Sequence, residues 1–226
     1  MDVVMLLYPR LTQLDLTGPF EVFGRYPELK LHLAWKSLDP IADGAGLRLL
    51  PTVTFADAPQ ADILFVPGGP GQIDLMMDDE VLGFLRRQAA GASLITSVCT
   101  GSLVLAAAGL LTDYRATCHW LSLEQLSYFG TVPVSERVVE DRNRITGAGV
   151  TSGIDFALTL AARIFGEDRA KAVQLAMEYD PAPPFVGGSP RSADTEAIAG
   201  SRERAARFQA HRDEVSRAAA ARLSAG

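Results

Sequence analysis

The sequence predicts an α/β fold with a mostly parallel central sheet. The first observation is that short runs of β-prone, apolar residues recur along the chain, clearest at 3–8, 61–66 and 93–98, as expected of strands buried on both faces. The second is that helical stretches such as 78–90 separate these runs, an alternation typical of parallel sheets. The third is a sharp turn between a strand and a helix that carries a cysteine.

This turn lies at Cys99, directly after the apolar run 93–98. Small residues follow at 100–102, and residues 103–108 read as a buried helix closed by Gly109. A helix N-terminus carries about half a positive charge and is expected to lower the pKa of a thiol placed there. We therefore predict a nucleophile elbow with Cys99 as the nucleophile. The alternative is a small buried hydrophobic residue at the end of a strand.

The first strand, residues 3–8, is ended by Pro9 and is followed by an acid in an apolar frame, Asp15. The pattern favours a loop there, with a helix opening at 17–19 and proline in its first turn. The carboxyl ends of parallel strands share one edge of a sheet. Asp15 and Cys99 are therefore expected to meet.

Two further stretches flank the strand at 61–66. Residues 29–36 alternate as a second strand, with His32 as a structural histidine, and 47–54 predict a peripheral strand or hairpin. The strand at 61–66 runs into the glycine-rich loop 67–71, which lacks a phosphate-binding motif. We expect backbone N–H groups near Gly69 to face the cysteine as an oxyanion hole; a plain tight turn is the alternative.

Beyond the elbow, the histidine at 119 could belong to the site or form structure or a pocket wall. Residues 132–140 and 144–146 predict a hairpin. The small-residue stretch 147–153 then forms a second elbow. It leads into helices at 154–165 and 167–179. The expected role of this elbow is to bring Val150 and Thr151 to the nucleophile as a pocket wall.

The C-terminal residues 193–223 are rich in alanine and arginine and predict one long surface helix, with a break near Gly200. Acidic residues intersperse the arginines, which favours a solvated or subunit-spanning helix over a nucleic-acid site. We accordingly divide the chain into an α/β domain, 1–190, and a helical extension, 191–226, packed on the domain or on a dimer partner.

Composition limits the classes of function. The chain has 226 residues, 48% of them hydrophobic, and a net charge of −6, which argues against nucleic acid as a partner. Its cysteines, Cys99 and Cys118, do not have the spacing of metal ligands and suit a reduced compartment. The N-terminus resembles neither a signal peptide nor a membrane span, so a cytoplasmic protein without membrane contact is expected.

Several motifs resemble the ThiJ/PfpI superfamily, and they cover nearly the whole chain. The resemblance implies a flavodoxin-like, doubly wound fold and a homodimer. It is strongest to the isocyanide hydratase branch, because Asp15 follows the first strand and Thr100 follows the cysteine, where protease-like members have histidine. The motifs are LDLTGPFEVF, FVPGGPG, TSVCTGSLVLAAAGLL, ATCHW, TGAGVTSGIDFALTLAA and EYDPAPPFVGGSP.

The resemblance implies Cys99 as nucleophile, Asp15 as acid and base, and Thr100 as a hydrogen-bonding neighbour. The expected reaction is hydration of a small-molecule isocyanide to an N-substituted formamide through a covalent thioimidate. This chemistry requires no metal and no organic cofactor. Two alternatives stay open: a glyoxalase-type enzyme acting on α-oxoaldehydes, and a non-catalytic redox or small-molecule sensor.

Overall fold

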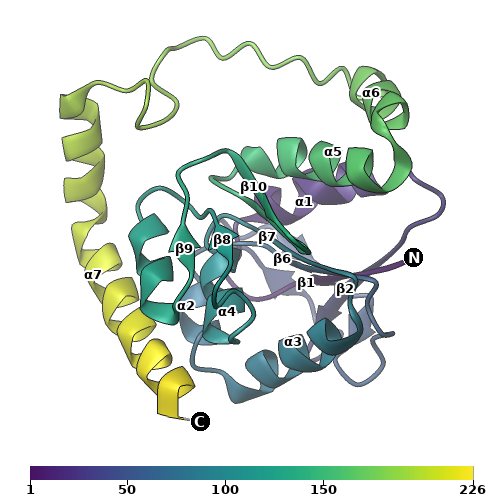
Figure 1. Ribbon diagram of the computed structural model, residues 1–226, viewed down its shortest axis with the longest axis horizontal. Helices are drawn as coiled ribbons and strands as arrows, with labels where there is room; N and C mark the ends of the chain where they lie inside the picture. Colours follow the sequence, from purple (N-terminus) through teal and green to yellow (C-terminus); the bar gives the residue numbers. More distant parts are fainter. Residues whose placement is uncertain (226) are drawn as a thin grey trace.

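A computed structural model describes residues 1–225 and contains a central seven-stranded sheet in the order β10-β11-β7-β6-β1-β2-β5 (Figure 1). All neighbouring strands are parallel except β10, which forms an antiparallel hairpin with β11. The predicted mostly parallel α/β fold is confirmed. The strands of this sheet are β1 (Asp2–Leu6), β2 (Lys30–Trp35), β5 (Val53–Thr54), β6 (Ile63–Val66), β7 (Leu94–Val98), β10 (Val138–Asp141) and β11 (Arg144–Gly147).

Helices cover both faces of the sheet, and the core lies between the layers (Figure 1). The central strands β1, β6 and β7 are almost completely buried, which explains why their sequences are apolar without alternation. One face is covered by α1 (Gln13–Phe23) and α5 (Ser152–Phe165), with α6 (Glu167–Ala176) beyond them. The other face is covered by α2 (Gln72–Leu75), α3 (Asp79–Gly91) and α4 (Gly101–Ala107).

Smaller elements lie at the edges of the sheet. The stretch 47–54 is peripheral, as predicted, since only its last residues join the central sheet beside β2. The predicted hairpin of 132–140 with 144–146 is confirmed only from Val138 onward, in β10 and β11, because residues 132–133 pair with β8 instead. The remaining elements are the antiparallel pair β3 (Ile41–Ala42) and β4 (Arg48–Leu49), the parallel pair β8 (Arg115–Ala116) and β9 (Val132–Pro133), and the 3-10 helix η1 (Leu123–Phe129).

The first helix begins earlier than the sequence pattern indicated. We expected a loop up to Thr17, but α1 starts at Gln13 and Asp15 lies in its first turn, with proline inside the helix. Leu16, Pro19 and Phe23 fall on one buried face at helical spacing. The free energy gained by burying this face exceeds the cost of the backbone hydrogen bond that is lost at Pro19, which has no N–H.

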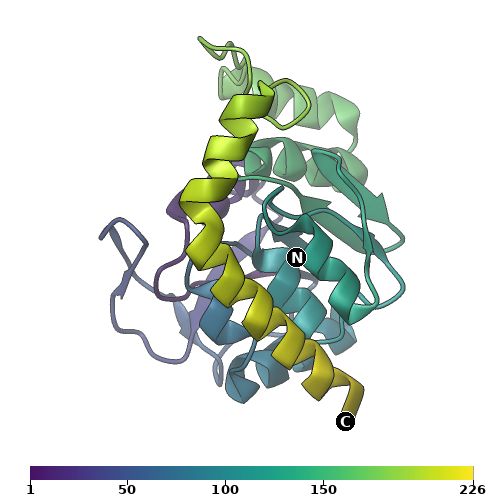
Figure 2. The same cartoon turned by 90° about the vertical axis from the view of Figure 1, so that its left-hand side faces the viewer.

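The C-terminal helix α7 (Thr195–Ala225) is continuous through Gly200, so the expected break is wrong. A glycine inside a helix costs only about 1 kcal/mol, which the long alanine-rich sequence tolerates. Figure 2 shows α7 lying across one side of the molecule, where its buried residues, including Ser216 and Ala219, contact the domain. No helix within residues 1–225 has the length and apolarity needed to cross a bilayer.

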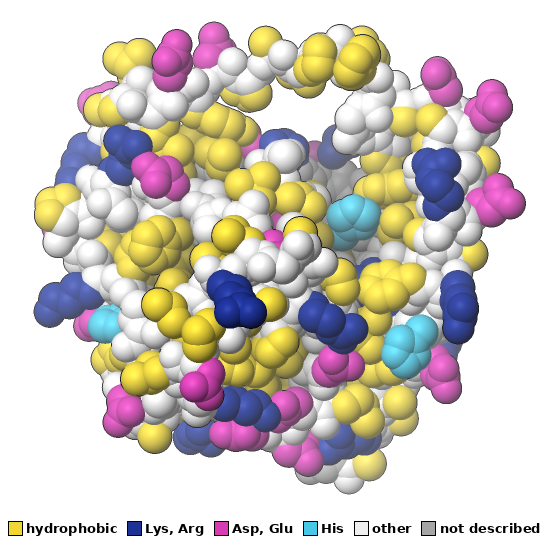
Figure 3. All heavy atoms as spheres, turned by 180° about the vertical axis from the view of Figure 1, so that it is seen from behind, with side chains coloured by type: hydrophobic (Ala, Val, Ile, Leu, Met, Phe, Trp, Pro, Cys, Tyr) yellow, Lys and Arg dark blue, Asp and Glu magenta, His cyan; other side chains and the backbone are white. Residues whose placement is uncertain are grey.

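Residues 177–194 connect α6 to α7 as an extended segment, which we call the strap. In Figure 3 the strap arches over an opening at the top of the molecule. Its apolar side chains are strongly exposed, Phe185 at 83% and Val186 at 93%. The strap therefore buries little of its own surface against the domain.

Candidate active site

Cys99 occupies a strained turn between β7 and α4. Its φ angle is +57°, in the left-handed region that costs a residue other than glycine roughly 1 kcal/mol. The Cys99 N–H donates to the carbonyl of Gly147 at the end of β11, at 3.0 Å, and this bond anchors the turn. The predicted elbow is therefore present, as a sharp turn that places Cys99 between the end of the strand and the start of the helix.

Asp15 meets Cys99 around a single glycine, Gly68. The Asp15 side chain is fully buried, and its Oδ2 accepts a hydrogen bond from the Gly68 N–H at 3.0 Å. A Cβ atom added to Gly68 would lie 2.8 Å from Asp15 Oδ2 and 2.8 Å from the Cβ of Cys99. The carboxyl group and Cys99 thus both pack against the Gly68 backbone, at a position with no room for a side chain.

The second carboxyl oxygen of Asp15, Oδ1, has no hydrogen-bond partner among residues 1–225. A buried polar atom of this kind is costly in a folded protein and is found where a proton or a ligand is handled. Oδ1 is therefore the carboxyl oxygen whose hydrogen-bonding capacity is unused by the described residues.

Burial controls the ionisation of this pair. It raises the pKa of Asp15 to about 7, opposed by the interactions with the Cys99 thiol and the Gly68 N–H. Burial also raises the pKa of Cys99, as do the negative charge of Asp15 and the Cys118 thiol, while the Thr100 N–H lowers it. The Thr100 N–H at the helix N-terminus lowers the pKa of Cys99, as the sequence predicted, but desolvation is the larger effect and the net shift is upward.

The glycine-rich loop serves a different purpose from the one expected. We expected Gly69 to offer a free N–H to the site, but this group donates to the hydroxyl of Thr100 at 3.0 Å. Gly69 has a φ angle of +138°, a conformation that side chains rarely adopt. The backbone N–H that contacts the Cys99 sulfur is that of Thr100.

The close approach at Gly68 leads to a test. Gly68→Ala should lower turnover by roughly a hundredfold, because the new methyl group displaces the reacting groups by about an ångström. Gly83→Ala, on α3, is the matched control, since a Cβ there meets only an arginine side chain at an ordinary distance. Both variants should be compared by turnover and thermal unfolding. A normal rate for Gly68→Ala would show that the close packing at this glycine is not needed for turnover.

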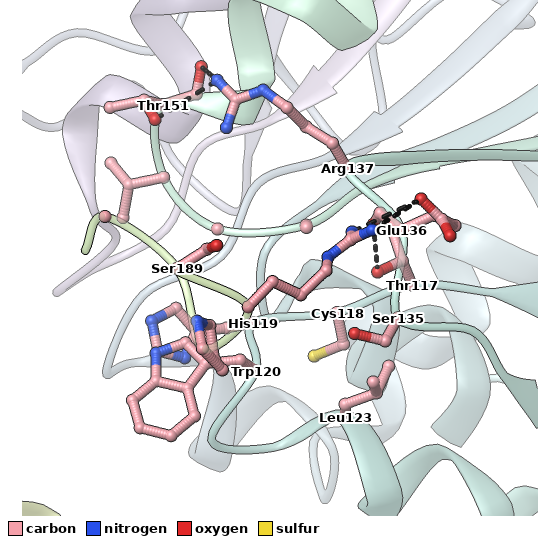
Figure 4. Close-up of a pocket in the computed structure, with 16 residues that line it drawn as sticks. Thr117, Cys118, His119, Trp120, Leu123, Ser135, Glu136, Arg137, Thr151 and Ser189 are labelled. Carbon is pink, nitrogen blue, oxygen red and sulfur yellow. Dashed lines mark hydrogen bonds and ion pairs between the residues drawn. The ribbon is translucent and has the colours of Figure 1, made fainter. Parts of the chain in front are cut away.

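A cavity of about 460 Å³ adjoins the elbow. Cys118, His119, Trp120 and Val150 contribute to its walls, and the sulfur of Cys118 points into it (Figure 4). Strap residues 188–191 also line it. Cys99 is not part of the lining, but the wall segment 148–151 directly follows Gly147, whose carbonyl binds the Cys99 N–H.

Val150 and Thr151 both line this cavity, where the sequence placed them as a pocket wall. Thr151 is exposed, and its hydroxyl and carbonyl accept hydrogen bonds from Arg137 at 3.4 and 3.2 Å (Figure 4). Arg137 also forms an ion pair with Asp155 on α5. Val150 therefore presents an apolar surface to the cavity, whereas Thr151 is held at the rim by a polar network.

Residues 1–163 match the profile of the DJ-1/PfpI family. The chain belongs to this family. It is 50% identical over 224 residues to the isonitrile hydratase of Pseudomonas putida, covering 99% of this chain and 98% of that one. The crystal structure of a ThiJ/PfpI family protein from Pseudomonas syringae superimposes with a TM-score of 0.93 at 44% identity, over 95% of this chain and 90% of that one. A glutathione-independent glyoxalase of Caenorhabditis elegans is 28% identical over 147 residues, 64% of this chain and 78% of that one.

These findings confirm the family resemblance and the flavodoxin-like fold. Within this DJ-1/PfpI chain, His119 forms part of the cavity wall, and its Nδ1 accepts the N–H of Leu121 at 3.3 Å. Burial and the charge of Arg212 lower the pKa of His119. Within residues 1–225, no group of three or more His, Cys, Asp and Glu side chains is arranged to hold a metal ion.

Sequence reasoning missed three features of the DJ-1/PfpI site. Gly68, rather than Gly69, packs against both the carboxyl group and Cys99. Cys118 faces the cavity, and Arg212 of α7 is buried close to both cysteines. The tight glycine loop was a signal for the first, but the last two depend on contacts between segments far apart in sequence.

Proposed function

We propose that this protein is an isocyanide hydratase, which converts an organic isocyanide, R–NC, and water to the N-substituted formamide, R–NH–CHO. The observation that carries the proposal is the Cys99–Asp15 pair around Gly68, in a chain that is 50% identical over its whole length to an isonitrile hydratase. Cys99 is the nucleophile, and Asp15 moves the protons.

In the first half of the reaction, the sulfur of Cys99 attacks the terminal carbon of the isocyanide. Asp15, as a carboxylate, takes the thiol proton and delivers it to that carbon, so that a thioimidate, S–CH=N–R, results. The free Oδ1 of Asp15 supports this role, because no protein group competes for it among the described residues. The Thr100 N–H stabilises the sulfur while it carries negative charge.

In the second half, water adds to the thioimidate carbon: Asp15 takes one proton from the water and passes it to the nitrogen, which gives S–CH(OH)–NH–R. The carbon–sulfur bond then breaks, and Asp15 passes the remaining hydroxyl proton to the departing sulfur, which leaves the formamide and the Cys99 thiol. A pKa of about 7 suits this exchange, since the carboxyl group accepts and releases protons near neutral pH. The hydroxyl of Thr100 holds the glycine loop in place through its bond to Gly69.

The cavity beside the elbow supplies room for the R group. Trp120, Leu123 and Val150 give it apolar walls, which suit a hydrocarbon or aryl substituent. Its volume of about 460 Å³ exceeds that of a small aryl group.

The test is to mix the purified protein with an aryl isocyanide and to follow formamide by chromatography, with methylglyoxal as a parallel substrate. Turnover at about one per second or more, in the range of ordinary enzymes, would support hydration. Turnover of methylglyoxal alone would move the protein to the glyoxalase class. No turnover of either substrate would favour a sensor, which mass spectrometry would test by detecting oxidation of Cys99 after mild peroxide treatment.

We also propose a homodimer, as the family resemblance implies. Leu175 on α6 and the strap residues Phe185 and Val186 are each more than 80% exposed, at 82%, 83% and 93%. Large apolar side chains exposed to this extent are expected to be covered by a partner. Light scattering should give twice the mass of the chain; the mass of a single chain would contradict the dimer.

A further inference from the structure

Arg212 is a buried cation without a carboxylate partner among residues 1–225. Only 5% of the residue is exposed, and its guanidinium group donates to two neutral acceptors, Gln72 Oε1 at 2.8 Å and Ser122 Oγ at 3.0 Å. By contrast, Arg217 on the same helix is exposed and paired with Asp213. A buried charge with neutral partners alone is costly, unless a negative group nearby balances it during function.

The two partners of Arg212 belong to the two segments that flank the nucleophile. Gln72 directly follows the loop 67–71, whose Gly68 packs against both Asp15 and Cys99. Ser122 closes the turn after Cys118, with its N–H bound to the carbonyl of residue 119 at 2.8 Å. The guanidinium group thus joins both segments.

A residue of α4 also connects the elbow to the segment that carries Cys118. The hydroxyl of Ser102 donates to the carbonyl of Thr117 at 2.7 Å, which fixes the segment carrying Cys118 against the first turn of the helix that follows Cys99. Arg212 consequently interacts electrostatically with both cysteines and with Tyr8 at the end of the first strand.

The charged and titratable groups that interact electrostatically with Cys99 or with Arg212 come from several elements. They are Tyr8 from the end of β1, Asp15 from α1, Cys118 and His119 from the segment after β8, and Arg212 from α7. Tyr8 donates its hydroxyl to the carbonyl of Pro67, and His119 has its pKa lowered by burial. Arg212 is therefore the permanent cation of this cluster, and the negative charges that it can balance are those of the cysteine thiolates.

Gln72 adds a second donor to this environment. Because its Oε1 accepts the Arg212 N–H, its Nε2 is turned away, and this buried amide nitrogen has no partner among the described residues. The cation and the amide together form a buried, donor-rich environment behind the reactive pair.

We propose that Arg212 is a positioning residue that stabilises the anionic form of Cys99, so that the C-terminal helix α7 completes the active site. Its effect on turnover rests on the proposed nucleophilic role of Cys99. Its effect on the thiol can be measured without an isocyanide.

The experiment measures the rate at which iodoacetamide alkylates Cys99 between pH 7 and 11, a range chosen because burial raises the pKa of this thiol, with the modified peptide quantified by mass spectrometry so that Cys118 is counted separately. Arg212→Gln should slow alkylation of Cys99 about tenfold near neutral pH and move the midpoint upward by about one pH unit. Arg212→Lys should restore much of the rate, since it retains the charge. Arg217→Gln, the matched control on the same helix, should leave the midpoint unchanged.

A purely structural role would give a lower melting temperature for Arg212→Gln with an unchanged alkylation midpoint, and that result would overturn the proposal. If Arg212→Gln does not fold, Gln72→Glu keeps the guanidinium in place and pairs it with a carboxylate. An unchanged midpoint in Gln72→Glu would overturn the proposal equally. Shifted midpoints in a protein that makes no formamide would uphold the role of Arg212 and refute the proposed hydration instead.

Discussion

Cys99→Ala is expected to reduce formamide formation to below about a hundredth of the wild-type rate, because alanine offers no atom that can bond to the isocyanide carbon. The fold should persist. Alanine is smaller than cysteine, and the left-handed turn at +57° strains both residues to a similar extent. Formamide measured by chromatography, with a thermal unfolding curve for each protein, separates loss of chemistry from loss of structure.

Cys118→Ala is the matched control, since this second buried cysteine faces the cavity but has no carboxyl group bound beside it. It should retain most of the activity. Acid quenching of the wild type during turnover should show a mass increase equal to that of the isocyanide on the peptide containing Cys99. Turnover by Cys99→Ala above about a hundredth of the wild-type rate would exclude the covalent route.

The local sequence was sufficient to predict the elbow and most of the sheet. A β-prone run that stops at Cys99 and is followed by Thr100 and Gly101 can hardly continue as a strand, and the buried strands 3–8 and 61–66 lack the alternation of half-exposed ones. These features depend on residues adjacent in sequence, so local patterns were sufficient to predict them.

The details that were missed depend on contacts between distant segments. Asp15 lies within α1 because its helix packs an apolar face on the core, which the local Thr-Gly-Pro sequence concealed. The pKa of Cys99 is governed by burial, which no local pattern reports. The sequence around Arg212 does not differ from the rest of this charged helix, and its role depends on the hydrogen bonds to Gln72 and Ser122, which are far away in sequence.

Asp15→Asn is expected to slow turnover by roughly a hundredfold or more, because the amide cannot accept the thiol proton or pass one to carbon. The amide oxygen can still accept the Gly68 N–H, so the geometry around the thiol should be kept. In the wild type, activity should fall as the pH drops through about 7, where Asp15 becomes protonated. This acid limb of kcat/KM should be absent from Asp15→Asn, and its persistence would assign proton transfer to another group.

The same substitution should stabilise the protein at high pH. Burial raises the pKa of Asp15 from 3.8 to about 7, so the folded state binds this proton more tightly than the unfolded chain. The stability due to that proton is fully present below pH 3.8 and is lost as the pH rises towards 7. At pH 8 the wild type buries a carboxylate and Asp15→Asn does not, which should make the variant more stable by roughly 2–4 kcal/mol.

Urea unfolding at several pH values checks this expectation. The difference in unfolding free energy between Asp15→Asn and the wild type should be large at pH 8, smaller at pH 6 and near its minimum at pH 4.5, where Asp15 is protonated in the folded protein. Such a gain in stability together with a loss of activity is what a carboxyl group kept buried for proton transfer should give. A variant less stable than the wild type at pH 8 would mean that the hydrogen bond from Gly68 and the contact with Cys99 outweigh desolvation, and Asp15 would then rest as a carboxylate well below pH 7.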